Sequence, residues 1–299
     1  MLKALMNEGD YRVLHALGHG QEVSRTEAVR ASGEAHSVLT DLAKRKAKWF
    51  DAAGKRFRLS EKGRAALAYE TRERTPKLGE ADHLDALEGR VRLRPQVQRE
   101  LDQVHAALPS VIRRARLLFE RGEAQRGIAF LGDDDLTALA VAILLEAAES
   151  ERRLRVFDVD REIVHFYGEV AHVDAVHHDL RAPLESRYWG AFGAVHSDPP
   201  YASEGFALFA NRAAELLKPD GHYYVHYGYS RRSRERGLAK QAILVERGWL
   251  LEAIHPDFSE YEGAESIGSR SALIVAAITP RTRAIEIGEE DDLYTRRTP

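Results

Sequence analysis

The stretch from Gly127 to Leu145 constrains the fold of this chain more than any other. It begins with an apolar run, Ile128 to Leu131, that has the length of a buried strand. Gly132 ends the run, three aspartates follow, and apolar residues at helical spacing resume at Leu136. A strand, a glycine turn and a helix in this order form the first βα unit of a doubly wound sheet. The sequence therefore predicts an α/β fold.

Three consecutive carboxylates, Asp133, Asp134 and Asp135, follow that glycine. Ligands of doubly wound sheets bind at the carboxyl ends of the strands, where this turn lies. Like charges a few ångströms apart raise each other's pKa, so a turn that needed only a helix cap would use one aspartate. We interpret the cluster as a functional site.

Strands and helices continue to alternate after this unit, as a parallel sheet requires. The domain predicted over residues 126–282 is Rossmann-like, and its seven strands with a closing hairpin resemble the sheet of S-adenosylmethionine-dependent methyltransferases. A turn is expected at Lys218–Gly221. The further strands span residues 154–157, 173–178, 191–196, 222–226, 249–255 and 272–278, and helices begin at Arg161, Gly205 and Arg234.

Acidic residues follow the second, third and fourth predicted strands. Asp158 lies roughly 20 residues beyond the glycine turn, where nucleotide-binding α/β folds bind ribose hydroxyls. Asp160 is instead expected to cap the next helix. Asp179 follows the third strand, within range of an adenine edge, and the fourth strand runs into Asp198. The candidate site thus extends along one edge of the sheet.

The pattern of helices and strands expected in residues 1–75 predicts a winged-helix domain. One use of such a domain is DNA binding through its basic third helix. The alternative is a dimerisation domain or a substrate lid, and it is favoured because the basic cluster is small. The elements expected are helices at Tyr11–Leu17, from Ser24 and at His36–Lys48, a hairpin wing at Trp49–Leu59 and a last helix from Ser60.

Two regions complete the division of the chain. Residues 76–125 are predicted to form the region between the two domains. The charged stretch Thr71–Arg90 is expected to be a linker, and the apolar spacing from Val97 to Gly122 predicts interdomain helices. Residues 283–299 form an acidic tail. Its segment Glu289–Tyr294 is either a flap that closes over a polycation or a frayed end.

Composition excludes several classes of protein. The chain has no cysteine, so disulfides, thiolate catalysis and thiolate metal sites are excluded. No run approaches the ~18 apolar residues of a membrane span, and no signal-peptide pattern is present. We expect a cytoplasmic protein with no metal ion and no membrane partner. Because winged helices often pair, a homodimer is also expected.

The tetrapeptide Asp198-Pro199-Pro200-Tyr201 resembles the catalytic motif of amino-group methyltransferases. In that family, the aspartate and a backbone carbonyl accept hydrogen bonds from the target amine, and the aromatic ring packs on its plane. The first turn departs from that family, which carries Gly-x-Gly there. The carboxylates after Gly132 would repel the α-carboxylate of S-adenosylmethionine.

Carboxylates at that turn suit a donor that has lost its carboxylate and kept its ammonium, which describes decarboxylated S-adenosylmethionine. The Gly-Asp-Asp-Asp turn, Asp-Val-Asp after strand two, Asp-Leu-Arg at Asp179 and Asp-Pro-Pro together resemble the branched-chain polyamine synthase family (bis(aminopropyl)spermidine synthase). The segment from Arg94-Pro95 to Asp102-Gln103 is similar to the interdomain region of that family, which also has an N-terminal winged helix. Tyr201 departs from it, since many members carry an acidic residue there.

The resemblance implies transfer of an aminopropyl group from that donor to a polyamine. Asp135 would face the attacking nitrogen, and Asp133 or Asp134 would hold the ammonium of the donor. The other contacts implied are Gly132 with the donor, Asp158 with its ribose, Asp179 at the adenine side, and Asp198 with the Pro199 carbonyl at the attacking amine.

Three residues are further candidates for substrate binding. Tyr227 lies near the carboxyl end of a predicted strand, where its ring could hold a cation. Glu260 and Glu262 lie in a predicted loop that either lines an acceptor channel or is simply solvated. Pro200 and Tyr201 of the tetrapeptide are also predicted to bind the substrate.

Two other functions remain open. An N-methyltransferase of a nucleobase or amide is favoured by Tyr201 and by the basic helix of the first domain. A winged-helix regulator that binds DNA would require a steep salt dependence of binding, which the small basic patch disfavours.

Overall fold

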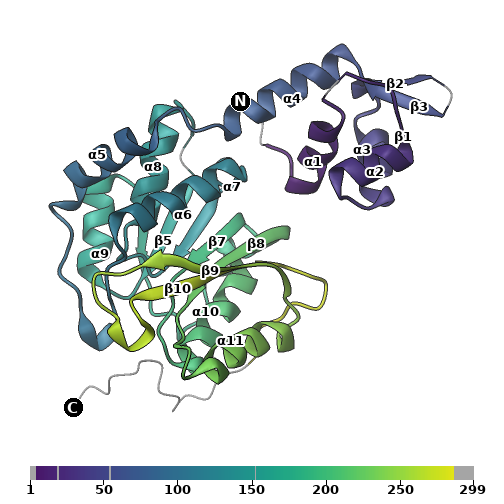
Figure 1. Ribbon diagram of the computed structural model, residues 1–299. Coiled ribbons are helices and arrows are strands. Elements are labelled where there is room, and N and C mark those ends of the chain that lie inside the picture. The colour runs from purple at the N-terminus through teal and green to yellow at the C-terminus, as the bar shows by residue number, and fades with distance from the viewer. Residues whose placement is uncertain (1–4, 19, 54, 152, 286–299) are drawn as a thin grey trace. The chain divides into compact units, whose positions relative to one another are not determined.

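The computed structural model describes residues 5–18, 20–53, 55–151 and 153–285. These residues form two compact units, labelled by element in Figure 1. The first contains the chain up to Pro76 together with Phe119–Gly122, and the second contains Lys77–Leu118 and the chain from Glu123 onward.

The first unit has four helices and a small sheet of order β1-β3-β2 among its described residues. Ser24 forms a capping box with Glu27 at the start of α2, and Ser60 caps α4. The third helix ends at Arg45, before the predicted Lys48, and a 3₁₀ turn follows. The elements are α1 Glu8–Ala16, β1 Val23–Ser24, α2 Arg25–Ser32, α3 His36–Arg45, η1 Ala47–Trp49, β2 Phe50–Ala53, β3 Arg56–Leu59 and α4 Glu61–Arg74.

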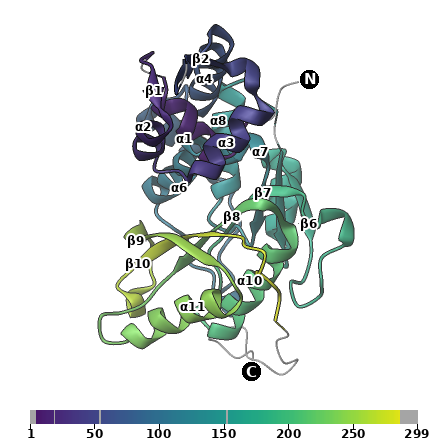
Figure 2. The same ribbon diagram turned by 90° about the vertical axis from the view of Figure 1, so that its right-hand side faces the viewer.

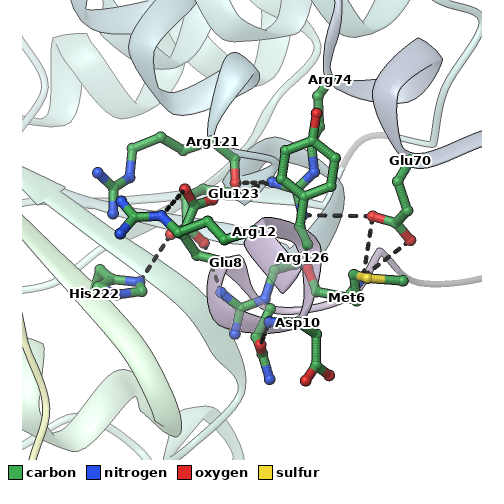
Figure 3. Close-up of polar contacts among 12 residues, drawn as sticks. Met6, Glu8, Asp10, Arg12, Glu70, Arg74, Arg121, Glu123, Arg126 and His222 are labelled. Atoms are coloured by element: carbon green, nitrogen blue, oxygen red, sulfur yellow. Dashed lines mark hydrogen bonds and ion pairs between the residues drawn. The ribbon is translucent and has the colours of Figure 1, made fainter. Parts of the chain in front are cut away.

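Arg74 at the end of α4 contacts several segments of this unit (Figure 3). Its side chain is buried, and its Nη2 donates to the Met6 carbonyl at 2.8 Å. It pairs with Glu70 at 3.5 Å and lies 4.3 Å from the centre of the Tyr11 ring. The buried charge is therefore neutralised within its own unit.

The second unit contains the predicted seven-stranded sheet, in the order β6-β5-β4-β7-β8-β10-β9. The first five strands of this order are parallel, and β10 pairs antiparallel with both β8 and β9. The turn expected at Lys218–Gly221 lies inside β8, beside a register shift with β7. The strands are β4 Ile128–Leu131, β5 Leu154–Asp158, β6 Asp174–His177, β7 Phe192–Ser197, β8 Leu217–Tyr227, β9 Leu250–Glu260 and β10 Arg270–Ala277.

Helices cover this sheet, and the two views show α10 and α11 side by side (Figure 1, Figure 2). The buried His83 of α5 lies with its Nε2 2.9 Å from the Ala140 carbonyl of α8, which joins those two helices. The helices are α5 Glu80–Val91, α6 Leu108–Glu120, α7 Glu123–Arg126, α8 Thr137–Ala147, α9 Arg161–Phe166, α10 Ser203–Leu216 and α11 Arg234–Glu246. Shorter turns are η2 Arg99–Leu101, η3 Tyr167–Ala171, η4 Ser186–Tyr188 and η5 Glu265–Ile267.

Two predictions about the middle of the chain were wrong. The stretch Thr71–Arg90 is mostly helical, because its charges surround buried residues at helical spacing, His83 and Leu87. Conversely, the predicted helix from Val97 is irregular up to α6, since Asp102 has a positive φ of 58°. Pro109 lies in the first turn of α6, where its missing N–H removes no helical hydrogen bond.

A buried charge network, the Glu123 network, lies at the end of the sheet where the parallel strands begin (Figure 3). Glu123 Oε1 lies 2.9 Å from His222 Nδ1 and accepts from the Tyr224 hydroxyl at 3.1 Å. Its Oε2 accepts from Arg126 Nη1 at 3.0 Å, and His222 Nε2 lies 3.4 Å from Glu252. Burial opposes the charge of His222, but Glu123 and Glu252 raise its pKa to about 9.

Two remaining expectations concern the membrane and the tail. Within residues 5–285, apart from 19, 54 and 152, no helix is both long and apolar enough to cross a membrane. The segment Glu289–Tyr294 lies outside the described residues.

Candidate functional site

The turn after β4 places the side chains of its three aspartates in different surroundings. Gly132 and Leu136 both have positive φ, 62° and 63°, and the Leu136 N–H donates to the Asp133 carbonyl at 3.1 Å. A left-handed conformation at a leucine is unfavourable and is maintained only by the surrounding structure. The chain therefore reverses within four residues and fixes each carboxylate separately.

Asp133 binds the free backbone N–H groups at the start of α8. Its carboxylate accepts from the backbone N–H groups of Thr137 at 3.1 Å and Ala138 at 2.7 Å, and from the Tyr167 hydroxyl at 2.5 Å. Burial raises its pKa to about 6, although these hydrogen bonds oppose the shift. Asp133 is absent from the cavity walls described below, so of the two residues expected to hold an ammonium, Asp134 has the better position.

Asp135 is held as an anion. Its Oδ1 accepts from the Ala106 N–H at 2.5 Å and lies 3.5 Å from Arg94 Nη2, and its Oδ2 accepts from Arg114 Nη1 at 2.5 Å. Burial alone would raise the pKa of Asp135, but Arg114 and Arg94 outweigh it and the pKa lies below its usual value. A carboxylate with a lowered pKa and both oxygens occupied is a poor proton acceptor.

Arg114 of α6 joins Asp135 to Asp198. Its Nη2 donates to Asp198 Oδ2 at 2.8 Å and to the Tyr261 hydroxyl at 3.0 Å, and its Nε donates to Ser259 Oγ at 2.9 Å. The Tyr261 hydroxyl in turn donates to Asp198 Oδ2 at 2.5 Å. Burial raises the pKa of Asp198 to about 6 despite the guanidinium. No described residue donates to Asp198 Oδ1, so that oxygen is available to a ligand.

Asp134 is the member of the turn that has a buried side-chain oxygen without a hydrogen-bond partner among the described residues. Its backbone carbonyl accepts from Arg94 Nε at 2.8 Å, but its buried Oδ2 has no hydrogen-bond partner among the described residues. Burial and the charge of Asp135 raise its pKa well above the usual value. An unpartnered buried carboxylate oxygen is costly unless a ligand satisfies it.

Asp158 at the end of β5 accepts two backbone hydrogen bonds, from Asp160 at 2.8 Å and from Asp133 at 3.1 Å. Burial raises its pKa to about 7 in spite of them. Asp160 caps α9 through the Glu162 N–H at 2.9 Å, as predicted, and also accepts from Gln103 at 3.1 Å.

Three adjoining cavities contain most of the predicted site residues. The inner cavity, of about 70 Å³, is lined by five aspartates and by no lysine or arginine of the described residues. An outer cavity of about 620 Å³ shares Asp102, Gln103, Val104 and Tyr201 with it and includes Glu262. The smallest, of about 40 Å³, joins Asp158 to Asp179 beside Phe209. Predicted residues of the inner cavity are Gly132, Asp134, Asp135, Asp158, Asp198, Pro199, Pro200 and Tyr201.

Two of the predicted substrate residues are not among those lining the cavities. Tyr227 is buried in the core, where its hydroxyl accepts from Gln241 at 2.9 Å and its ring stacks on Tyr229. Glu260 is exposed and pairs with Arg270 at 2.9 Å. Neither contact leaves the side chain facing the aspartates.

The sequence interpretation missed Arg114, and a signal for it was present. Arg114 follows Val111 by three residues and precedes Leu118 by four, so it lies on the buried face of α6. An arginine inside an apolar helical stripe needs a buried anion. Among the described residues, no group of three metal-binding side chains is arranged to hold an ion.

Comparison with known proteins gives three findings. Residues 82–295 match the model of the branched-chain polyamine synthase A C-terminal domain. An uncharacterized protein of Methanocaldococcus jannaschii is 31% identical over 208 residues, which are 68% of this chain and 51% of the relative. The N(4)-bis(aminopropyl)spermidine synthase of Thermus thermophilus is 29% identical over 56% of this chain and 50% of its own length. The chain thus spans about half the length of these curated relatives.

A solved structure has a similar fold. The branched-chain polyamine synthase from Thermus thermophilus, in complex with N4-aminopropylspermidine and 5'-methylthioadenosine, superposes with a TM-score of 0.60. It is 23% identical, and the match covers 96% of this chain and 91% of that one.

Proposed function

Because the chain belongs to the branched-chain polyamine synthase A C-terminal domain family, we propose that it is an aminopropyltransferase. It moves the aminopropyl group of decarboxylated S-adenosylmethionine to an amine of a spermidine-like polyamine, giving a branched polyamine and methylthioadenosine. The observation that carries the proposal is the inner cavity, which is lined by five aspartates and by no cationic residue of the described chain.

The donor is recognised by charge. Its ammonium binds the unpartnered oxygen of Asp134, while Asp158 binds the ribose and Asp179 faces the adenine. The α-carboxylate of intact S-adenosylmethionine would meet Asp134 and be repelled. The raised pKa values of Asp134, Asp158 and Asp198 support this assignment, because a bound cation favours their ionised forms and releases protons.

The acceptor amine binds at Asp198, whose Oδ1 takes one proton from its ammonium group. The freed lone pair attacks the aminopropyl carbon next to sulfur, the carbon–sulfur bond breaks, and its electron pair stays on sulfur as neutral methylthioadenosine. The nitrogen that attacked carries the positive charge after the transfer. The Pro199 carbonyl and Tyr201, with Pro200 between them, orient the amine.

The role we propose for Asp135 differs from the one that the family resemblance implied. Its two oxygens are bound by Arg114, Arg94 and the Ala106 N–H, so it positions Arg114 and through it Asp198. The outer cavity beyond Tyr201 accommodates the rest of the polyamine, with Glu262 in its wall. The compounds named with the Thermus thermophilus structure support a polyamine acceptor.

Tyr201 favours a second candidate, an N-methyltransferase of a nucleobase or amide, because its ring lines both the inner and the outer cavity. The two functions differ in product mass. The protein is incubated with spermidine and either decarboxylated or intact S-adenosylmethionine, and the amines are analysed by mass spectrometry. Aminopropyl addition with the decarboxylated donor is expected. Methyl transfer from the intact donor, or no transfer from the decarboxylated one, would overturn the proposal.

The first unit is assigned to the winged-helix class on the order of its helices and of strands β1, β2 and β3. We propose residues 1–75 as this domain, 76–125 as the interdomain region, 126–282 as the catalytic domain and 283–299 as a tail. A cytoplasmic homodimer is the expected form, and nucleic-acid binding by α3 is the less favoured use of the first domain.

A further inference from the structure

We propose that Lys240 of α11 is a positioning residue for the acceptor, because its ammonium fixes the loop that carries Asp198 and Tyr201. Lys240 Nζ donates to the Tyr201 carbonyl at 2.7 Å, and the side chain is only 3% exposed. The inference rests on the function proposed above and adds to it the element that holds the loop in place.

The loop between β7 and α10 has few other means of fixing its backbone. Pro199 and Pro200 have no N–H to donate. The N-cap of α10, Ala202, has no side chain able to cap the helix. Among the hydrogen bonds of the described residues, the one from Lys240 is the one that reaches the backbone of residues 199–201.

Burial of the Lys240 ammonium costs hydration free energy, which is offset in part by its hydrogen bond to the Tyr201 carbonyl. Lysine is almost never fully buried unless it is paired. Burial, with the charge of Arg236, lowers its pKa to about 8, whereas Glu204 opposes that shift. The ammonium lies 5.9 Å from the centre of the Phe206 ring, which compensates part of the loss of hydration.

The loop is therefore held from two helices. At its first residue, Arg114 of α6 and Tyr261 hold the Asp198 carboxylate. Near its other end, Lys240 holds the Tyr201 carbonyl, and Tyr201 lines the inner and outer cavities. Release of the second point lets Tyr201 and the acceptor shift, whereas the donor side at Asp134 and Asp158 is untouched.

The test compares Lys240→Met, which keeps the length and apolar stem of the side chain, with Lys240→Arg, which keeps a charged donor. The matched control is Arg234→Met, which removes an exposed charge from the same helix and from a residue that does not act on the charge of Lys240. Since misplacement by about 1 Å costs up to about 100-fold in rate, we expect Lys240→Met to lower kcat with spermidine by roughly 10- to 100-fold. Affinity for methylthioadenosine should stay within about two-fold, Lys240→Arg should recover much of the rate, and the control should match the wild type.

Two further measurements separate this inference from the proposed function. Hydrogen exchange of residues 201–206, followed by mass spectrometry, should quicken in Lys240→Met and not in the control, whatever reaction the protein catalyses. In a Tyr201→Ala background, Lys240→Met should have little further effect on kcat.

The outcomes are distinct. A wild type that forms no aminopropyl product refutes the proposed function, and faster exchange in the variant still supports the role of Lys240. An active wild type with unchanged exchange and kcat in Lys240→Met overturns the inference. Equal losses of methylthioadenosine affinity and kcat, without recovery by Lys240→Arg, would also overturn it, since they indicate a general structural defect.

Discussion

Where the parallel strands begin, Glu123 is buried with Arg126, His222 and Tyr224 bonded to its two oxygens. Where the same strands end, Asp134 has a buried side-chain oxygen that no described residue satisfies. Both regions contain buried carboxylate oxygens, and they lie at opposite ends of the same parallel strands. They differ in whether the protein itself supplies the partners.

The difference separates stability from function. A buried ion pair with complete hydrogen bonding maintains the fold, and removal of one partner is strongly destabilising. A buried carboxylate without a partner weakens the fold and gains its partner on binding a cation. The Glu123 network should therefore control the free energy of unfolding, and the aspartates of the cavity should control activity.

The largest effect is expected at Asp198. Asp198→Asn removes the proposed proton acceptor, and general base catalysis is worth about 10² to 10⁴ in rate. Single-turnover formation of methylthioadenosine should fall by that factor, while the melting temperature stays near that of the wild type. The control is Asp174→Asn on the exposed side of β6. Retention of more than about one tenth of the rate would remove Asp198 from the mechanism.

Glu123→Gln tests the opposite end of the sheet. It leaves Arg126 and His222 without their buried anion, so urea titration should show a loss of about 3 to 5 kcal/mol in the free energy of unfolding at pH 7. The rate per folded molecule should not change. Glu151→Gln, at an exposed position, serves as control. A loss of activity that exceeds the loss of folded protein would contradict the separation of the two regions.

His222 gives the Glu123 network a pH dependence. Its folded pKa of about 9 lies above its unfolded value, so its stabilisation is complete below about pH 6.5 and is lost as the pH rises through about 9. The difference in unfolding free energy between wild type and His222→Gln should shrink by roughly 2 to 3 kcal/mol across that window. Tyr224→Phe removes an uncharged donor to the Glu123 carboxylate and leaves His222 in place, so its effect should vary much less with pH. A constant difference for His222→Gln would argue against the charged pair.

The smallest effect, with the opposite sign, is expected at Asp134. Its folded pKa is raised, so ionisation at higher pH destabilises the protein. Asp134→Asn should raise the unfolding free energy by about 1 kcal/mol at pH 8, and the gain should fade in acid while aminopropyl transfer is lost. Asp133→Asn is the matched variant, because it weakens the cap of α8 and should lower stability. Destabilisation by both variants at pH 8 would mean that Asp134 also holds the fold.

The parallel sheet was predictable because buried strands and glycine turns leave local signals. Ile128–Leu131 and Gly132 mark the first βα unit without reference to any distant residue. The same locality explains the error at Val97, Leu101 and Val104. Their spacing is typical of an amphipathic helix. In the structure, however, Leu101 and Val104 line the cavities and do not form the apolar face of a helix.

The partners of the carboxylates were not predictable from the local sequence. Asp135 meets Arg114 from a helix that precedes β4, and Asp198 meets Tyr261 from the loop after β9. Only the assembled sheet brings these residues together. The sequence predicted that the clustered carboxylates raise each other's pKa, whereas the cations beside Asp135 lower its pKa and burial raises that of Asp134.

The reversal at Leu136 has a consequence for how this turn can change. Because each carboxylate has its own surroundings, insertion of a single residue between Gly132 and Leu136 would displace aspartates from their contacts even though all three remain in the sequence. The helix would lose its cap, the guanidinium its counterion and the ligand its anchor at once. We expect a change of length here to impair stability and activity together, whereas substitution of one aspartate should affect mainly the contact that this aspartate makes.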